Sequence, residues 1–190
     1  MPDSLTTLLT YFLFRWTLAN MLGWSLGFFL GGLLLSALGG IVGVLLGGVV
    51  VGALVGIGQW LILRRETNWA NARWALVSAV GGGLATIPAY LSGVTLIAGP
   101  SIGYFVIGAV YGGIFGTLQW LILRAPYDDL AVLWLIANVI GGGLCGCLTM
   151  TVNPLRLPVF CSIGPVAFGL ITGYTLLYLH RETSEDTPSP

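Results

Sequence analysis

The chain has 190 residues, of which 56% are hydrophobic and only 7% are charged, and its seven arginines balance seven acidic residues. About a quarter of the residues in an average soluble domain are charged. The composition therefore excludes an ordinary soluble protein, and the lack of a basic face excludes a nucleic-acid-binding protein. What remains is an integral membrane protein that lies in the lipid bilayer. A spanning helix needs about 20 residues, so the chain has room for about seven or eight crossings at most.

Six apolar stretches lie between the clusters of charged residues. They are residues 16–36, 41–63, 74–91, 102–123, 130–150 and 158–179. At about 1.5 Å per residue, each is long enough to cross a hydrocarbon core about 30 Å thick. The sequence therefore predicts an all-α, polytopic membrane protein with six transmembrane helices in a single domain over residues 16–181.

Three segments fall outside this regular pattern. Residues 1–15 carry apolar side chains at helical spacing, which predicts either a short interfacial helix or an inner extension of the first span. Residues 92–103, rich in glycine and apolar side chains, form either a covered connection or a re-entrant segment. Residues 182–190 are polar and contain proline, which predicts a disordered tail.

The arginines predict the orientation in the membrane. With six spans, six of the seven arginines lie on the side of both termini, and only Arg156 lies on the other side. Cytoplasmic loops carry the excess of positive charge, so both termini are predicted to be cytoplasmic. Tryptophans cluster near the same span ends and predict an aromatic belt, with stacking on a quinone or pigment as the alternative. The predicted interface anchors are Arg15, Arg64, Arg73, Arg124, Arg181, Trp16, Trp60, Trp74, Trp120 and Trp134.

An internal repeat organises the chain. The segment QWLILR occurs at residues 59–64 and again at 119–124, which is 60 positions later. The same register matches Trp74 with Trp134, and a shift of 57 residues extends it into a third copy, with Leu176 at the glutamine position. This pattern predicts three repeated, parallel helical hairpins in a pseudo-threefold bundle. The repeats cover residues 16–64, 74–124 and 134–181.

Glycines recur every four residues on the returning helix of each hairpin. In lipid, small residues let helix backbones approach closely, so this spacing predicts glycine zippers that pack the helices. A glycine-lined pore is the alternative interpretation. The predicted packing glycines are Gly48, Gly52, Gly56, Gly108, Gly112, Gly116, Gly169 and Gly173.

The polar residues of the spans lie on the same helix faces as these glycines. The side chains concerned are Asn20, Gln59, Ser78, Gln119 and Asn138. Such a placement predicts hydrogen bonds between helices inside the bundle. The alternative is a ring of amides around a polar cavity that binds a polar solute or the metal of a pigment.

Groups for catalysis are scarce. The chain has one histidine, His180, at the end of the last span, and no acidic residue lies within a span. A thiolate metal site needs three or four ligands, and Cys145 and Cys147, two residues apart and about 200° around a helix, cannot both face one ion with Cys161. No base is placed to activate a hydroxyl nucleophile. We therefore expect no enzyme activity, catalytic residue, metal site or cofactor.

The hairpin signature G-x-x-x-G-x-x-Q-W-L-x-L-R, followed by W-x-x-x-(N/S)-x-x-G-G, resembles a group of uncharacterised small multi-pass proteins of photosynthetic bacteria. The resemblance implies a repeated-hairpin fold in the cytoplasmic or thylakoid membrane, without an assigned activity. The sequence has many glycines at helix-packing spacing and few residues suited to catalysis. It therefore predicts a non-catalytic scaffold, assembly or accessory subunit that packs in a larger membrane complex or a homo-oligomer. The alternative is a small passive solute-binding or transport protein that uses the amide ring.

Overall fold

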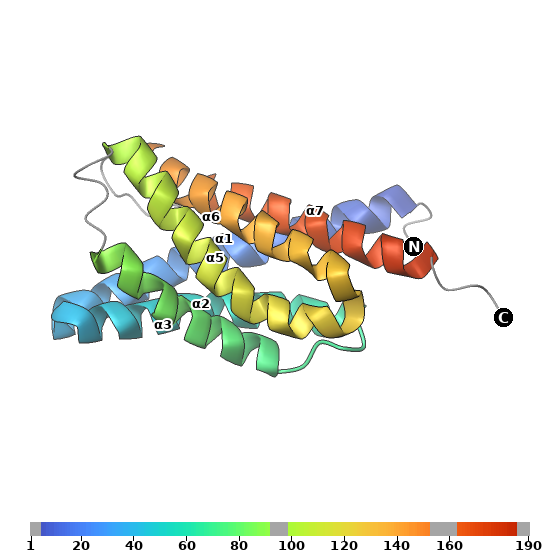
Figure 1. Cartoon of the computed structure of the whole chain (residues 1–190), viewed down its shortest axis with the longest axis horizontal. Helices are drawn as coiled ribbons and strands as arrows, with labels where there is room; N and C mark the ends of the chain where they lie inside the picture. The colour runs from blue at the N-terminus through green and yellow to red at the C-terminus, as the bar shows by residue number, and fades with distance from the viewer. Residues whose placement is uncertain (1–4, 92–98, 153–162, 186–190) are drawn as a thin grey trace.

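The computed structural model describes residues 5–91, 99–152 and 163–185, and the regular structure in these ranges is helical throughout (Figure 1). The elements are α1 (Leu5–Leu38), α2 (Gly40–Glu66), α3 (Arg73–Leu91), α5 (Pro100–Tyr127), the 3-10 helix η1 (Asp128–Ala131), α6 (Val132–Val152) and α7 (Ile163–Glu185). Five helical stretches of the described residues are long and apolar enough to cross a membrane, and one of them, Ser101–Thr149, takes in α5, η1 and α6. The predicted all-helical fold with membrane-length helices is confirmed.

The structure matches one of the two predicted alternatives at the start of the chain and differs from the prediction at its end. Residues 5–15 continue without a break into the first predicted span, so the segment extends α1. At the other end α7 runs to Glu185, so residues 182–185 are helical where a disordered tail was expected. Adding a turn to an existing helix requires no new nucleus, which lets a polar sequence follow an apolar helix.

Some of the predicted segments lie outside the described residues. They are 1–4 of the N-terminal segment, 92–98 of the connection 92–103, 158–162 of the last apolar stretch, and 186–190 of the tail; Arg156, the arginine predicted on the other side of the membrane, lies outside them too.

A glycine pair makes the reversal between α1 and α2. Gly39 and Gly40 have φ values of +63° and +52°, in the left-handed region that residues with a Cβ rarely adopt. The chain therefore reverses between two long helices without an intervening loop. The reversal between α5 and α6 is made by η1 and begins at Asp128, whose φ is +46°.

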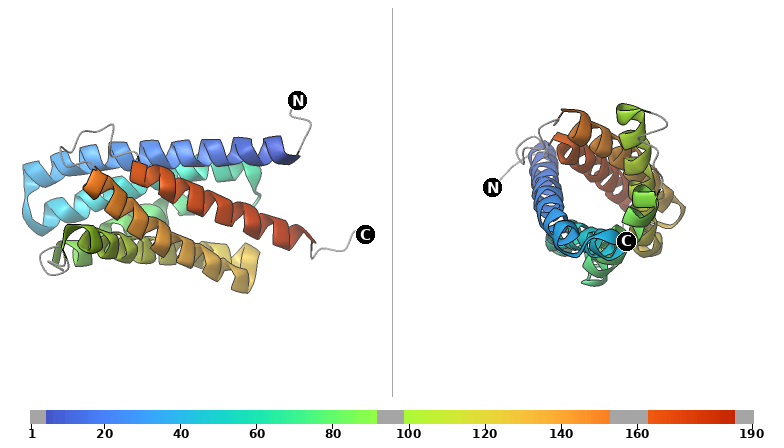
Figure 2. Two further views of the ribbon diagram at one scale, coloured as in Figure 1. Left: turned by 90° about the horizontal axis from the view of Figure 1, so that it is seen from above. Right: turned by 90° about the vertical axis from the view of Figure 1, so that its left-hand side faces the viewer.

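The helices form a closed ring. Each packs against the next one along the chain, and α7 packs against α1. The right-hand view of Figure 2 looks along the bundle and shows this arrangement. The start of α1, the end of α7, the α2–α3 connection and η1 lie together at one end (Figure 1). We call it the arginine end, because Arg15, Arg64, Arg73 and Arg124 lie near it, and we call the opposite end the far end.

Two clusters of buried side chains fill the ring. The tryptophan cluster lies toward the arginine end and is built on Trp16, Trp74, Trp134, Leu63, Leu123 and Leu176. The aromatic cluster lies deeper in the bundle and is built on Trp24, Val55, Tyr111, Phe115, Cys145 and Phe168. The polar residues singled out by the sequence lie between these clusters or beside them.

Candidate functional site

All five predicted polar residues are completely buried in the bundle. They come from five helices: Asn20 from α1, Gln59 from α2, Ser78 from α3, Gln119 from α5 and Asn138 from α6. A buried amide or hydroxyl is costly in an apolar environment unless it is hydrogen-bonded. The hydrogen bonds among these five side chains therefore show whether any of them is left to bind a ligand.

The two glutamines form the centre of a hydrogen-bonded chain. Nε2 of Gln119 donates to Oε1 of Gln59 at 2.9 Å and to Oγ of Ser78 at 2.8 Å. Nε2 of Gln59 donates to Oδ1 of Asn20, also at 2.9 Å. One continuous chain of side chains thus joins α1, α2, α3 and α5 across the middle of the ring.

The glutamines also accept hydrogen bonds from two indoles of the tryptophan cluster. Nε1 of Trp74 donates to Oε1 of Gln59 at 3.0 Å, and Nε1 of Trp134 donates to Oε1 of Gln119 at 3.2 Å. The two pairs are 60 residues apart and make the same contact. The second pair brings α6 into the network.

Trp16 makes the corresponding contact with a residue that the sequence did not single out. Its Nε1 donates to Oγ1 of Thr172 in α7 at 3.0 Å, and that hydroxyl donates in turn to the carbonyl oxygen of Phe168 at 2.8 Å. Thr172, not Leu176, thus holds the glutamine position of the third copy. The register of 57 residues is one helical turn too long there.

Glycine contacts show the same one-turn shift. A Cβ atom at Gly56 would meet the side chain of Ser78, and one at Gly116 would lie 2.5 Å from the Cβ of Asn138. In the third copy Gly169 holds this place, because its Cβ would lie 3.3 Å from the Cβ of Asn20. A shift of four residues keeps Gly169 and Gly173 on one helix face. Spacing alone therefore could not distinguish the two registers.

The side chains on the outgoing helices bond to their own backbone as well. Nδ2 of Asn20, Oγ of Ser78 and Nδ2 of Asn138 each donate to the carbonyl oxygen of the tryptophan four residues earlier, at 2.7–2.9 Å. Asn20 and Ser78 then bond to a glutamine. Oδ1 of Asn138 is buried and has no hydrogen-bond partner among the described residues. It is the one place where the network is incomplete.

Three of the predicted belt tryptophans do not face the lipid. Trp16, Trp74 and Trp134 have no exposed surface. Their rings pack against one another, with centroids 6.2 Å apart for Trp16–Trp134 and 5.7 Å apart for Trp74–Trp134. Each precedes an inward-facing Asn or Ser by four residues, and this spacing places it on the same inner face. As members of an outward-facing aromatic belt they were predicted wrongly.

Trp60 and Trp120 are partly buried and carry arginines on their rings. The guanidinium carbon of Arg64 lies 5.1 Å from the ring centroid of Trp60, and that of Arg124 lies 4.8 Å from the centroid of Trp120. These are cation–π distances. The repeated Trp–Arg pairs thus form the same surface feature twice at the arginine end.

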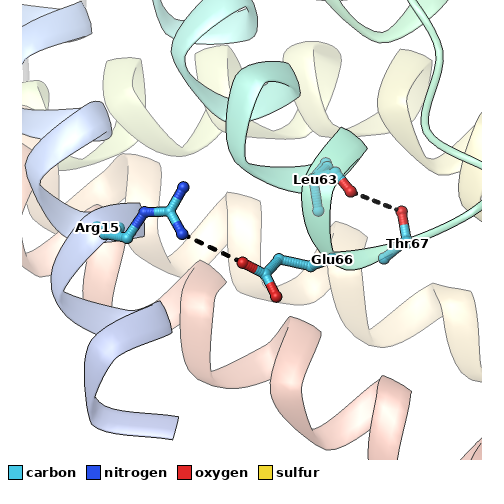
Figure 3. A network of polar contacts seen from close by, with 4 residues as sticks. All are labelled: Arg15, Leu63, Glu66 and Thr67. Atoms are coloured by element: carbon cyan, nitrogen blue, oxygen red, sulfur yellow. Dashed lines mark hydrogen bonds and ion pairs between the residues drawn. The ribbon is translucent and has the colours of Figure 1, made fainter. Parts of the chain in front are cut away.

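Arg15 joins α1 to the end of α2. Its Nη1 lies 3.2 Å from Oε1 of Glu66, and the guanidinium also lies 5.2 Å from the ring of Tyr11. Figure 3 shows this ion pair beside Thr67, whose hydroxyl donates to the carbonyl oxygen of Leu63 at 3.0 Å. The second contact satisfies a carbonyl of the last turn of α2. The ion pair is exposed, and the hydroxyl contact is part-buried.

The predicted packing glycines lie where helix backbones meet. A Cβ at Gly48 would lie 2.6 Å from the carbonyl oxygen of Gly82, and Cβ atoms at Gly52 and Gly112 would overlap the carbonyl oxygens of Ser78 and Asn138. The remaining glycines of the set are equally confined; they are Gly56, Gly108, Gly116, Gly169 and Gly173. The close contacts of α2 with α3, of α5 with α6 and of α7 with α1 therefore require glycine at these positions.

The network joins the helices through amide, hydroxyl and indole groups. In the described ranges no set of three His, Cys, Asp or Glu residues is arranged to hold a metal ion. His180 lies away from the amides and lines a cavity of about 410 Å³ at the arginine end with Glu66 and Tyr127. No protein family, curated protein or solved structure matches the chain. The inference to function therefore depends on the geometry.

Proposed function

We propose that this chain is a non-catalytic integral membrane protein that acts as a scaffold, assembly or accessory subunit. The observation that carries the proposal is the amide network, in which the side chains of Gln59 and Gln119 form hydrogen bonds with residues of neighbouring helices. Side chains that only connect helices stabilise a rigid body and perform no reaction. The exterior is apolar on every helix, as at Leu26, Leu76 and Leu170, and can lie against lipid or another membrane protein.

The proposed topology has six crossings, with both termini in the cytoplasm. The chain reverses at η1, and the proposal gives α5 and α6 one crossing each. The acidic pair Asp128–Asp129 at this point is a polar turn that favours such a reversal. The gathering of arginines at one end supports the orientation, in the cytoplasmic or thylakoid membrane of a bacterium.

We also propose that the bundle has pseudo-threefold symmetry about the membrane normal. Three equivalent contacts support it: Trp74 with Gln59, Trp134 with Gln119, and Trp16 with Thr172. The units related by this symmetry are the glycine-packed pairs α2–α3, α5–α6 and α7–α1. In each unit, glycine zippers bring the backbones together, and one indole hydrogen bond fixes their register.

Purification of the tagged chain in a mild detergent tests the scaffold role. We expect a stoichiometric membrane partner or a homo-oligomer to elute with it. The Leu76→Trp variant changes the exposed face of α3, and the Leu26→Trp variant changes the exposed face of α1. The variant whose face contacts the partner should release it, and the other serves as its matched control. Purification of a monodisperse single chain in digitonin and in dodecyl maltoside, with neither variant changing the profile, would contradict the proposal.

A second candidate function has one observation in its favour. The unpartnered Oδ1 of Asn138 is an acceptor beside the amides, as a passive solute-binding or transport protein would need. Proteoliposomes that contain the wild type and the Gln59→Leu, Gln119→Leu double variant test it. Solute flux that the double variant abolishes supports transport, and equal leakage from both and from empty liposomes rejects it.

A further inference from the structure

The hydrogen-bonded network links neighbouring helices at five of the six junctions around the ring. The five links are Gln59 with Asn20, Trp74 with Gln59, Gln119 with Ser78, Trp134 with Gln119, and Trp16 with Thr172. The sixth junction lies between α6 and α7, where Asn138 and Thr172 hold the equivalent positions. Among the described residues, Oδ1 of Asn138 has no hydrogen-bond partner, and Thr172 bonds only to Trp16 and to its own helix.

The missing link follows from the length of the side chain on α7. In the other two hairpins, the amide nitrogen of the glutamine reaches the outgoing helix and donates to the polar side chain there. The hydroxyl of Thr172 is bonded directly to Cβ, and its hydrogen is donated to the carbonyl oxygen of Phe168. Thr172 therefore has no hydrogen for Asn138, whose side-chain carbonyl oxygen is left as a buried acceptor.

The two helices do not move together to compensate for the shorter side chain. The separation can be compared at the glycine three residues after Asn20, Ser78 and Asn138, from an added Cβ to the Cα of the returning helix. This distance is 2.8 Å from Gly23 to Val55, 3.3 Å from Gly81 to Phe115 and 3.6 Å from Gly141 to Phe168. At this level α6 and α7 are therefore the most widely separated of the three equivalent pairs.

Toward the far end the same two helices are in close contact. A Cβ at Gly164 of α7 would overlap the carbonyl oxygen of Cys145 and the hydroxyl of Thr149, both of α6. The backbones of α6 and α7 therefore touch here and are farther apart beside the amide network. The contact of Gly164 with Cys145 is suited to act as a pivot between the two helices.

Separation of α6 from α7 costs less than separation at the other junctions. Local opening of a protein occurs where the fewest interactions are lost, and here no hydrogen bond of the network is lost. Asn138 lies six residues from the start of α6 at Val132, which is about 9 Å along the helix from the arginine end. Water that enters from that end can donate to Oδ1 of Asn138, which has no donor while the ring is closed.

We propose that the junction of α6 with α7 is the place where the ring opens. The parts of these helices near the arginine end separate about the contact of Gly164 with Cys145, while the other five junctions stay closed. The helix α7 remains on α1, because Gly169 packs against α1 and Trp16 bonds to Thr172. Opening gives the membrane surface access to the amide network. This conformational device goes beyond the scaffold role and does not depend on it.

Two equivalent leucines provide a matched test of this opening. Leu63 and Leu176 lie four residues after Gln59 and Thr172, are both buried and line the same cavity at the arginine end. The full chain is placed in lipid nanodiscs as Leu63→Cys and as Leu176→Cys. Mass spectrometry follows the reaction of each introduced thiol with a water-soluble maleimide and distinguishes it from the native cysteines. The Leu176→Cys thiol should react about three- to thirtyfold faster, the factor that one interhelical hydrogen bond accounts for. Equal rates, or a faster reaction in Leu63→Cys, would overturn the proposal.

The Thr172→Gln variant supplies the missing link. Its amide can accept from Trp16 and donate to Asn138, as the glutamines of the other hairpins do for their partners. It should slow the reaction of the Leu176→Cys thiol about three- to thirtyfold and leave that of the Leu63→Cys thiol unchanged. The control Thr175→Val removes a hydroxyl that bonds to its own helix and should change neither rate. An unchanged or faster reaction of the Leu176→Cys thiol in Thr172→Gln would overturn the proposal.

The converse variant places the short side chain at another junction. Gln119→Thr keeps a hydroxyl that can accept from Trp134 and removes the bond to Ser78, which joins α5 to α3. The thiol of Leu123→Cys, four residues after Gln119, should then react at least about threefold faster than with Gln119 present. The Leu63→Cys thiol should keep its rate. No change at Leu123→Cys, or an equal rise at both thiols, would show that the link does not control opening and would overturn the proposal.

Discussion

Toward the arginine end, the bundle joins its helices through polar side chains that bond to one another. Gln59 and Gln119 contact each other, and indole N–H groups from two neighbouring helices donate to them. Toward the far end, Trp24, Tyr111 and Thr149 are equally buried, yet their polar atoms bond to no described residue. Both regions belong to the same ring of apolar helices. They differ in whether their polar groups serve the fold.

The repeat provides a physical criterion for this difference. Polar residues that pack the helices recur in equivalent places, as the glutamines do at positions 59 and 119. The unpartnered groups of Trp24, Tyr111 and Thr149 each occur in one copy, opposite Gly, Val or Ala in another. Recurrence in the repeat therefore marks the polar groups that join the helices.

The largest predicted effect comes from a close contact next to the network. In Gly52→Ala the new Cβ would overlap the carbonyl oxygen of Ser78, so α2 and α3 must separate. We expect a loss of about 3 kcal/mol in the free energy of unfolding, the upper end of the usual cost of overpacking, measured by titration with sodium dodecyl sulfate. Gly32→Ala in α1 is the matched change, because an added Cβ there meets no atom within 4 Å, and it should cost nothing. A similar loss in both variants would contradict the contrast between the two regions.

Removal of the network's centre should have the next largest effect. Gln119→Leu breaks contacts with Gln59, Ser78 and Trp134, and interhelical hydrogen bonds in membranes contribute about 0.6–2 kcal/mol each. At the average of about 0.6 kcal/mol per bond, the free energy of unfolding should fall by about 2 kcal/mol. Thr117→Val in the same helix removes only a bond to the carbonyl of Gly113 and serves as the control. Equal stability of the two variants would show that the amide chain contributes nothing.

A smaller effect tests the third copy. Thr172→Val removes the acceptor of Trp16 Nε1 and leaves that donor buried without a partner, which should cost about 1–2 kcal/mol. Leu176, which the sequence register placed at this position, makes only apolar contacts there. The Leu176→Met substitution should therefore change the free energy of unfolding by less than about 1.5 kcal/mol. A double-mutant cycle of Thr172→Val with Trp16→Phe should show coupling, and strict additivity would argue against the shifted register.

The smallest effect is expected at the surface of the arginine end. Arg15→Gln breaks the ion pair with Glu66, whose side chain is 42% exposed. Exposed pairs contribute little, so the change should be below about 0.5 kcal/mol and should shrink further in high salt. Glu66→Gln should match it. A loss above about 1 kcal/mol would show that the helix ends stabilise the bundle as much as its polar centre does.

Much of the polar network could be predicted from the sequence because two periodicities coincide. The 60-residue repeat marks Gln59 and Gln119 as equivalent, and helical spacing places Asn20, Ser78 and Asn138 on the glycine faces. Which atoms bond could not be predicted, because hydrogen bonds between helices depend on the order of the helices around the ring. The shared contact of Gln119 with Gln59 and Ser78 is of this kind.

The tryptophans were predicted from their position near the span ends, without regard to which face of the helix they occupy. Residues near span ends are often belt residues, yet Trp74 lies four positions before Ser78 and so shares its inward face. The unpartnered atoms of Trp24, Tyr111 and Thr149 had no signal in the sequence beyond the asymmetry of the repeat. The three residues come from α1, α5 and α6 and approach one another only in the closed bundle.

The closure of α7 against α1 has a consequence for biogenesis. Trp16 and its acceptor Thr172 are 156 residues apart. At about 5–20 residues per second, the ribosome needs roughly 8–30 s to make the chain between them. During that time the first helix waits in the translocon or the lipid with an unbonded indole N–H on its inner face. Docking of the last helix is therefore the step that closes the ring and gives the Trp16 indole its acceptor.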